Sequence, residues 1–274
     1  MKKYYLLVNP KGGHKKGLEI YDRVKHVFSN SKAEVTVLHT EYAGHAFDFA
    51  NTLDFVGYDG LCAIGGDGTM YEIINGMLKR EDKQKIPIGL ITGGTGNSFM
   101  YDVDCLDPVD AAKRIVQHNL RPLDIAKVNA NGDLFYSFNI IGWGLATDAG
   151  KLAEKLRWLG GIRYDVASII EVLKGKDRIA TLKLDKEVIK ENFIFIIGCN
   201  TIHTGKAMKM APLAQLNDGK IDLIIVRKTS RINLLKLFPK LFSGDHIKSS
   251  LVEYRQVENF SITLKENNDL TIDG

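Results

Sequence analysis

The stretch of sequence that decides the fold is residues 65–76, Gly-Gly-Asp-Gly-Thr-Met-Tyr-Glu-Ile-Ile-Asn-Gly. A short apolar run at 60–64 precedes it and predicts a buried strand, and a helical pattern begins after its glycines. Glycine allows a positive φ and lets a ligand approach the backbone. The start of a helix offers N–H groups and a partial positive charge, both of which suit a phosphate. The predicted phosphate-binding turn contains Gly65, Gly66, Gly68 and Thr69.

Asp67 stands between these glycines, where an incoming phosphate would lie. A carboxylate in that place can act as a general base on an attacking hydroxyl, or it can help to hold Mg²⁺. The alternative interpretation is an aspartate that caps a plain strand–helix turn. Glu72 and Asn75 stand three residues apart on one face of the expected helix and favour the functional interpretation. The stretch has neither the Gly-Lys-Ser/Thr of a P-loop nor the Gly-x-Gly-x-x-Gly of a Rossmann turn.

Two more glycine-containing loops follow expected strands. Residues 93–98, Gly-Gly-Thr-Gly-Asn-Ser, come after the strand expected at 86–91, and residues 9–13, Asn-Pro-Lys-Gly-Gly, come after the one expected at 4–8. Small residues in the first loop would admit a ribose or an adenine edge, and its Thr and Asn would supply hydrogen bonds. The lysine of the second loop either meets phosphate oxygens as a point charge or is a solvated turn residue. The predicted nucleotide contacts in these loops are Asn9, Lys11, Gly12, Gly94, Thr95, Gly96 and Asn97.

The pattern of predicted strands and helices changes near Pro122. Before it, strand patterns alternate with helical patterns, which predicts an α/β domain over 1–122 with a parallel sheet, whose ligands would lie at the carboxyl ends of strands. After it, strand patterns separated by turn signals predict a β-rich, sandwich-like second domain over 123–264. The strands expected are 4–8, 34–39, 60–64, 86–91, 124–128, 134–141, 179–184, 192–198, 221–226 and 260–264, and the helices 18–28, 43–53, 71–78, 108–117, 152–173 and 231–242.

The composition excludes several classes of protein. The longest apolar runs, 193–199 and 223–226, fall well short of the roughly 18 residues that a membrane span needs. Cys62, Cys105 and Cys199 form an odd, widely spaced set, which argues against a disulfide framework or a zinc site. The net charge of +4 is mild and is compatible with a nucleotide or with an anionic membrane surface. We expect a cytoplasmic protein without a nucleic-acid partner that contacts a membrane only peripherally.

The three glycine motifs, in this order, resemble the diacylglycerol kinase catalytic domain family, which includes sphingosine, ceramide and bacterial lipid kinases. The similarity extends from Tyr4 to Gly274. It implies a nucleotide domain, a β-sandwich lipid domain and ATP in the cleft between them. It also implies that the chain transfers the γ-phosphate of ATP, with Mg²⁺, to the alcohol of a lipid at a membrane surface.

Further site residues follow from the resemblance alone. Thr40, with Gly-His-Ala at 44–46, matches a family segment near the nucleotide, and Glu72 belongs to the family motif there. Asp124 matches an aspartate that the family places close to the metal and phosphates. Asp218 lies in a turn that holds a structural metal in some bacterial members.

One departure from the family concerns the last residues. Family members carry Asp-Gly-Glu where the chain returns to the active site, and the glutamate is a proposed general base in bacterial members. This sequence has Asp273 and Gly274 at that place, so residues 265–274 are expected near the first domain with Asp273 at the nucleotide. Asp67 is then the base that can be named, as the matching aspartate is in sphingosine kinases.

Residues 143–164 bear on the choice of lipid. Trp-Gly-Leu-Ala-Thr-Asp at 143–148 resembles the sphingosine and ceramide kinase branch, in which aspartates after Trp-Gly meet the substrate amine. Asp148 is kept, whereas Gly150 stands where a second acid is common. We therefore rank a sphingoid-type base first and diacylglycerol close behind. The leucines at 152, 156 and 159 either line a lipid tunnel or pack on the core.

The segment 227–242 is basic and amphipathic. It either rests on an anionic membrane or forms an ordinary surface helix with solvated lysines, and Pro239 would kink or shorten it.

Two rival functions remain. NAD kinases share Gly-Gly-Asp-Gly, but they carry an Asn-Glu dipeptide that this sequence lacks. A catalytically impaired, lipid-binding regulatory protein with a kinase fold is the other alternative, motivated by the missing glutamate and opposed by Asp67 and Asp124. The sequence leaves the oligomeric state open.

Overall fold

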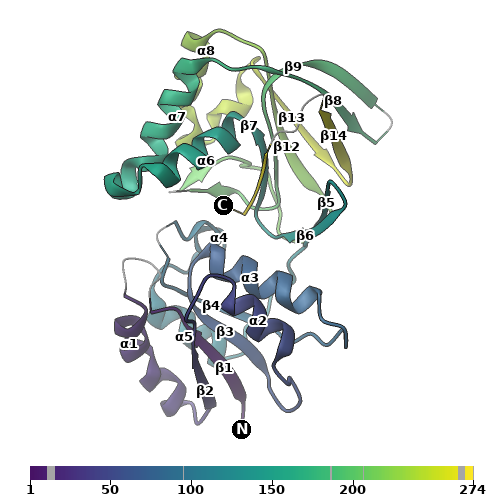
Figure 1. Ribbon diagram of the computed structural model, residues 1–274. Helices are drawn as coiled ribbons and strands as arrows, with labels where there is room; N and C mark the ends of the chain where they lie inside the picture. The colour runs from purple at the N-terminus through teal and green to yellow at the C-terminus, as the bar shows by residue number, and fades with distance from the viewer. Residues whose placement is uncertain (11–15, 95, 186, 206, 265–268, 274) are drawn as a thin grey trace. The chain divides into compact units, whose positions relative to one another are not determined.

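The computed structural model describes residues 1–10, 16–94, 96–185, 187–205, 207–264 and 269–273. The chain divides into two compact units, shown in Figure 1. The first unit comprises Met1–Pro122 with Lys127–Tyr136, and the second comprises Leu123–Ala126 with Ser137–Gly274.

The first unit is built on a parallel four-stranded sheet in the order β2-β1-β3-β4. Alternate residues of its strands face opposite sides. Tyr5 and Leu61 pack against α2 and α3 on one face, whereas Tyr4 meets Phe28 of α1 and donates a hydrogen bond to the Ile115 carbonyl of α5 on the other. The elements are β1 (Lys3–Val8), α1 (Gly17–Asn30), β2 (Glu34–His39), α2 (His45–Thr52), β3 (Gly60–Gly65), α3 (Asp67–Leu78), β4 (Ile88–Thr92), α4 (Ser98–Asp102) and α5 (Pro108–Val116).

A hairpin formed by β5 (Ala126–Ala130) and β6 (Asp133–Ser137) belongs largely to this unit. Asn75, a buried residue of α3, holds it in place. The Asn75 amide donates to the Tyr136 carbonyl at 2.8 Å and accepts from the Tyr136 N–H at 3.0 Å. Asn75, near the end of the 65–76 stretch, therefore has a structural role in binding the hairpin.

The second unit contains a seven-stranded sheet with antiparallel pairs. Its order is β13-β12-β9-β7-β15, and β8 joins β9 to β14. The long strand β9 pairs with β8 through its first half and with β7 and β12 through its second. The elements are β7 (Ile140–Gly144), α6 (Leu145–Lys155), α7 (Arg163–Lys174), β8 (Arg178–Leu184), β9 (Glu187–Cys199), β10 (His203–Thr204), β11 (Met208–Lys209), β12 (Ile221–Arg227), α8 (Arg231–Leu237), α9 (Lys240–Ser243), β13 (Val252–Val257), β14 (Phe260–Leu264) and β15 (Leu270–Ile272).

This sheet has a core on each face. Ile224 packs with Val172 of α7 and Leu234 of α8, so the helices cover one side. Leu223 and Ile225 pack with residues of β8 on the other. The alternation of neighbouring residues along β12 produces both cores.

The fold predicted from the sequence, an α/β domain with a parallel sheet followed by a β-rich domain, is confirmed. The strand expected at 134–141 is two strands, β6 and β7, because the chain turns between them around Asp273. The helix expected at 152–173 is interrupted by a 3₁₀ helix, Arg157–Ile162, in which Gly160 has φ 58°. The helix expected at 231–242 is also two helices, since α9 starts after Pro239.

The expected place of residues 265–274 near the first domain stays a prediction. Residues 265–268 and 274 lie outside the described residues. Leu270–Ile272 pairs with β7 as the edge of the second unit's sheet.

Candidate active site

Two glycine turns of the first unit contact each other backbone to backbone. The Gly93 N–H donates to the Gly65 carbonyl at 2.7 Å. A Cβ on Gly66 would lie 2.8 Å from the Gly94 Cα, and a Cβ on Gly94 would lie 2.5 Å from the Gly66 Cα. Because real Cβ atoms do not approach so closely, glycine is required at both positions and fixes the turns against each other.

The N-terminus of α3 opens beside this contact. Gly66 is its N-cap, with extended backbone (φ −125°, ψ −165°) and no side-chain cap. The first bond of the helix runs from the Met70 N–H to the Gly66 carbonyl, so the N–H groups of residues 67–69 precede it. A Cβ on Gly68 would meet nothing within 4 Å. The turn thus presents backbone donors and the positive end of a helix dipole to an anion.

The Asp67 carboxylate is held by the next loop. It accepts hydrogen bonds from the Ser98 N–H at 2.8 Å and from the Phe99 N–H at 3.2 Å. Asp67 therefore caps α4 rather than its own helix. Two bonds to backbone fix the orientation of a half-buried carboxylate.

Asn97 shapes that loop. It has a left-handed backbone (φ 50°, ψ 40°). Its side-chain oxygen accepts from the Gly94 N–H at 3.0 Å, and its amide donates to the Gly94 carbonyl at 2.9 Å. The Asn97 side chain thus binds the Gly94 backbone, and its contact with a nucleotide stays a prediction. Thr95 lies outside the described residues.

Glu72 connects α3 to the segment that contains Thr40. Its carboxylate accepts from the Gly44 N–H at 3.0 Å and from the Ala46 N–H at 3.2 Å, and so caps the start of α2. Thr40 is buried at the end of β2, where its N–H donates to the Val8 carbonyl. Glu72 thus positions the residues of the predicted nucleotide segment.

The loop after β1 lies at the same sheet edge. The Asn9 N–H donates to the Ile64 carbonyl at 3.3 Å, which places Asn9 beside the end of β3. A Cβ on Gly17 would lie 2.1 Å from the Asn9 carbonyl oxygen, so α1 starts directly against this loop. Lys11 and Gly12, both predicted to contact the nucleotide, lie outside the described residues.

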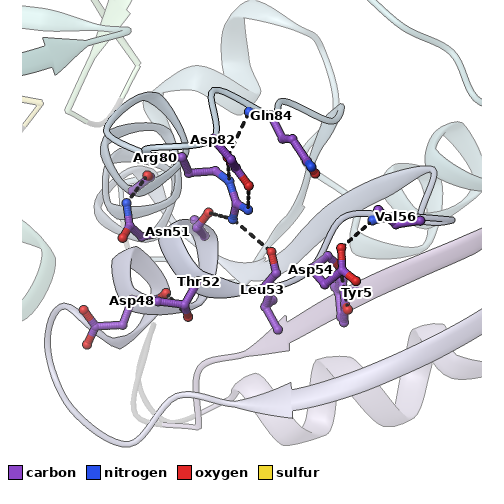
Figure 2. A network of polar contacts seen from close by, with 12 residues as sticks. Tyr5, Asp48, Asn51, Thr52, Leu53, Asp54, Val56, Arg80, Asp82 and Gln84 are labelled. Carbon is purple, nitrogen blue, oxygen red and sulfur yellow. Dashed lines mark hydrogen bonds and ion pairs between the residues drawn. The ribbon is translucent and has the colours of Figure 1, made fainter.

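Arg80, which follows the C-terminal end of α3, ties α2 and α3 together, as Figure 2 shows. Its guanidinium donates to the Ala50 and Leu53 carbonyls at 3.1 and 2.9 Å and pairs with Asp82 at 2.5 Å. It also lies 4.2 Å from the centre of the Phe55 ring. The side chain satisfies the carbonyls at the end of α2, a task that the sequence analysis did not assign.

Asp124 belongs to the second unit. Its carboxylate accepts from the Gly219 N–H at 2.7 Å, and its own N–H donates to the Leu216 carbonyl at 2.7 Å. Asp218 lies in that loop, where its carboxylate accepts from the Lys220 N–H and closes the turn. The structure therefore brings Asp124 and the Asp218 turn together.

Among the described residues, no three His, Cys, Asp or Glu side chains are grouped closely enough to hold a metal ion. The nearby Asp222 is buried, and burial raises the pKa of its carboxyl group, which accepts from Tyr254 and Gln256. The proposed metal role of Asp218 thus rests on the resemblance alone.

Asp273 lies in a pocket of backbone N–H groups. Its carboxylate accepts from the N–H groups of Phe138, Asn139 and Ile140 and from the Ser137 hydroxyl, at 2.7–3.0 Å. Burial raises the pKa of this carboxyl group to about 6, although the hydrogen bonds lower it. Its described contacts fasten β15 to the turn before β7, and its place at the nucleotide stays a prediction.

Asp148 lies in the first turn of α6 and forms an ion pair with Arg178 at the start of β8. The distance between Asp148 Oδ2 and Arg178 Nη2 is 2.6 Å, and the side chains are 25% and 18% exposed. The carboxylate that was predicted to meet a substrate amine therefore has a cation from its own chain. Sequence reasoning missed Arg178, because the partner stands thirty residues away without a motif around it.

Two family models match the chain. Residues 3–128 match the diacylglycerol kinase catalytic domain, and residues 139–274 match the YegS C-terminal NAD kinase beta sandwich-like domain. The chain belongs to the diacylglycerol kinase catalytic domain family, a family of lipid kinases.

Individual relatives agree with this assignment. Sphingosine kinase 1 of Arabidopsis thaliana is 27% identical over 94% of the chain, and the match covers 64% of that relative's own length. Diacylglycerol kinase of Bacillus subtilis is 26% identical over 100% of the chain and 90% of its own length. A crystal structure of a putative diacylglycerol kinase from Bacillus anthracis superposes with a TM-score of 0.81 at 24% identity, covering 100% of this chain and 90% of that one, and shows the same fold.

Proposed function

We propose that the chain is an ATP-dependent lipid kinase that transfers the γ-phosphate of ATP to the alcohol group of a lipid. The observation that carries the proposal is the uncapped N-terminus of α3 beside the contact of Gly66 with Gly94. Backbone donors there suit phosphate oxygens, and the open space at Gly68 leaves room for them. The family to which the chain belongs supports the same reaction.

Asp67 is the residue that we assign to the chemistry. Phosphoryl transfer depends mainly on alignment and on neutralisation of charge, and a fixed carboxylate accepts the proton of the attacking alcohol. Its two backbone hydrogen bonds keep the carboxylate in one orientation at the start of α3, beside the predicted phosphate-binding turn. A carboxylate oxygen also suits Mg²⁺, which when bound would neutralise charge on the phosphates.

We propose a lipid alcohol as the substrate, and the Asp148–Arg178 ion pair now favours one that lacks a cationic group. A sphingoid amine would have to displace Arg178 from the carboxylate. A neutral alcohol such as a diacylglycerol leaves the pair intact. This reverses the order in which the sequence ranked the two lipids, and a sphingoid-type base becomes the second candidate.

The test of the reaction is incubation of the purified chain with labelled ATP, Mg²⁺ and separate lipids, followed by separation of labelled products. We expect a labelled phospholipid from diacylglycerol and less product from a sphingoid base. ATP binding without labelling of any lipid would support the impaired regulatory protein instead. A parallel incubation with NAD in place of the lipid that gives labelled NADP would support the NAD kinase alternative.

A separate variant tests the phosphate turn. Gly68→Ala places a methyl group in open space, so the fold should be kept, and alanine favours a helix over glycine by up to about 1 kcal/mol. The methyl group would crowd a bound phosphate at a cost of about 1–3 kcal/mol, so ATP should bind about tenfold more weakly by calorimetry. Gly150→Ala is the matched control, since a Cβ on this residue of α6 also meets nothing within 4 Å. Equal ATP affinity in both variants would remove the turn from the proposed site.

A further inference from the structure

The helix α7 has an unusual distribution of apolar residues. Its inner side is buried through Ala167 and Val172, as expected for a helix on the core. Ile169 and Leu173 nevertheless lie on its outer side, 40% and 51% exposed. Residues four apart share a helix face, so these two form an apolar stripe directed at solvent. A helix that is apolar on both sides is expected to be covered on both.

Neighbouring residues extend this stripe. Trp158 and Ile162, in the turn that leads into α7, are 79% and 55% exposed. Ile232 of α8 is 66% exposed. Its neighbour Arg231 donates to the Lys174 carbonyl at the end of α7, and Lys228 pairs with Asp177 at 3.2 Å, so the start of α8 lies beside the end of α7. Trp158, Ile162, Ile169, Leu173 and Ile232 are here called the α7 face.

Positive charge is concentrated in the two sequence segments that contain the α7 face. Residues 151–176 contain six Lys and Arg against three acids, and residues 227–248 contain six against one, so together they carry a net charge of +8. The whole chain carries only +4, which leaves the remaining residues with −4. Lys155, Lys236 and Lys240 are exposed on these segments.

An apolar stripe with a basic surround fits an anionic lipid bilayer. Lysines next to a bilayer attract anionic headgroups, while apolar side chains enter the interface. Tryptophan is the residue that most favours this depth, and Trp158 is the most exposed large side chain of the α7 face. A second copy of the chain would be a poor occupant, because two surfaces of the same positive charge would oppose each other.

We infer that the α7 face docks the protein on anionic membranes, with Trp158 inserted at the interface and Lys236 and Lys240 above the headgroups. This inference rests on the proposed function only in that the substrate is a lipid. It differs from the expectation for 227–242, since the apolar contact comes from the outer side of α7. In α8, Leu234 and Leu237 are buried in the core.

Vesicle flotation tests the inference without ATP or any substrate lipid. The vesicles contain phosphatidylcholine with about 30% phosphatidylserine, or phosphatidylcholine alone, an ordinary anionic and neutral pair. We expect Trp158→Ala to bind the anionic vesicles about tenfold more weakly, as for loss of one buried aromatic side chain. Lys236→Gln with Lys240→Gln should weaken binding to anionic vesicles about 25-fold, roughly fivefold per lysine, and leave the weak binding to neutral vesicles unchanged.

The control is Val188→Gln on β9, which removes an apolar residue of 62% exposure from the same unit outside the α7 face. It should bind as the unaltered chain does, and all variants should melt at the same temperature because every altered side chain is exposed. Equal vesicle binding by Trp158→Ala and Val188→Gln, or no binding by the unaltered chain, overturns the inference. So does a dimer in sedimentation that Trp158→Ala dissociates while vesicle binding persists. Because vesicle flotation does not measure catalysis, a negative result would refute only the membrane inference. The proposed kinase reaction is tested separately by the labelling assay.

Discussion

At the scale of single residues, Asp67 combines a structural and a proposed chemical role. Its carboxylate caps α4 through two backbone N–H groups. We expect Asp67→Asn to retain one of these bonds and to lower the free energy of unfolding by about 1–3 kcal/mol. Loss of a general base should reduce lipid phosphorylation by at least about a hundredfold, while ATP affinity is largely kept. Turnover, ATP titration and thermal melting of this variant give the three readings.

Asp107 supplies a matched control for that experiment. It also caps a helix, α5, but through one oxygen: Asp107 Oδ1 accepts from the Val109 and Asp110 N–H groups. Asparagine keeps that oxygen, so Asp107→Asn should change neither stability nor turnover by much. If both variants lose activity to the same extent, or if Asp67→Asn turns over normally, Asp67 is only a helix cap.

Asp148 is the residue on which the choice of lipid depends. If its partner is Arg178 alone, Asp148→Asn should alter the phosphorylation of a sphingoid base and of diacylglycerol equally. The stability lost should lie between about 1 kcal/mol for an exposed pair and about 3–5 kcal/mol for a buried one. A double-mutant cycle with Arg178→Gln isolates the pair. A selective loss of the sphingoid reaction would restore amine recognition.

At the scale of elements, Arg80 joins the C-terminal ends of α2 and α3. We expect Arg80→Met to lower the free energy of unfolding by about 2–4 kcal/mol, because the Ala50 and Leu53 carbonyls lose their donor in a nearly buried place. Arg80→Lys should recover only part of this, since an ammonium cannot reproduce the planar fork. Chemical denaturation measures the change. Asp82→Asn should lower the free energy of unfolding less than Arg80→Met does. A larger loss in Asp82→Asn would mean that the ion pair, and not the hydrogen bonds to the Ala50 and Leu53 carbonyls, is the main contribution of Arg80.

The same elements show what the sequence could predict. The parallel strands β1, β3 and β4 were found because they are apolar runs that end in glycine loops, as β3 does at Gly65, whereas β2 was found from its alternation. The motif placed Asp67 and the glycines at a strand–helix junction, where they lie. The strand β13 was not expected: it reads Val-Glu-Tyr-Arg-Gln-Val, whose charged residues hide the alternation. Nor could spacing reveal that Glu72, Asn75 and Asn97 bind backbone, because such partners carry no side-chain signature.

At the scale of the whole molecule, the two units differ in tryptophan content, and tryptophan fluorescence can be used to follow unfolding. Both tryptophans of the chain, Trp143 and Trp158, belong to the second unit. Trp143 is buried in its core and Trp158 is exposed. A change in tryptophan fluorescence on unfolding therefore reports the second unit, and the part of the change due to burial reports Trp143.

That probe makes the pH response of the second unit measurable, and His246 should contribute to it near neutrality. The ring is buried and its Nε2 lies 2.9 Å from the Met210 carbonyl, which accepts its proton. Burial lowers the pKa of His246 below its usual 6.5, and the neighbouring Asp245 opposes this only in part. The unfolded chain then binds more protons than the folded one between the lowered pKa and 6.5, so stability is complete above this window and falls as the pH drops through it. Each unit of lowering corresponds to about 1.4 kcal/mol.

Asp273, whose carboxyl pKa is raised to about 6, acts in the opposite sense, and comparison with a His246 variant removes its contribution. We expect the fluorescence melting temperature to fall from pH 7.5 to 5.5 by more in the unaltered chain than in His246→Gln, which keeps a donor for Met210 without titrating. A melting temperature with the same pH dependence in both proteins would show that another group controls the acid response.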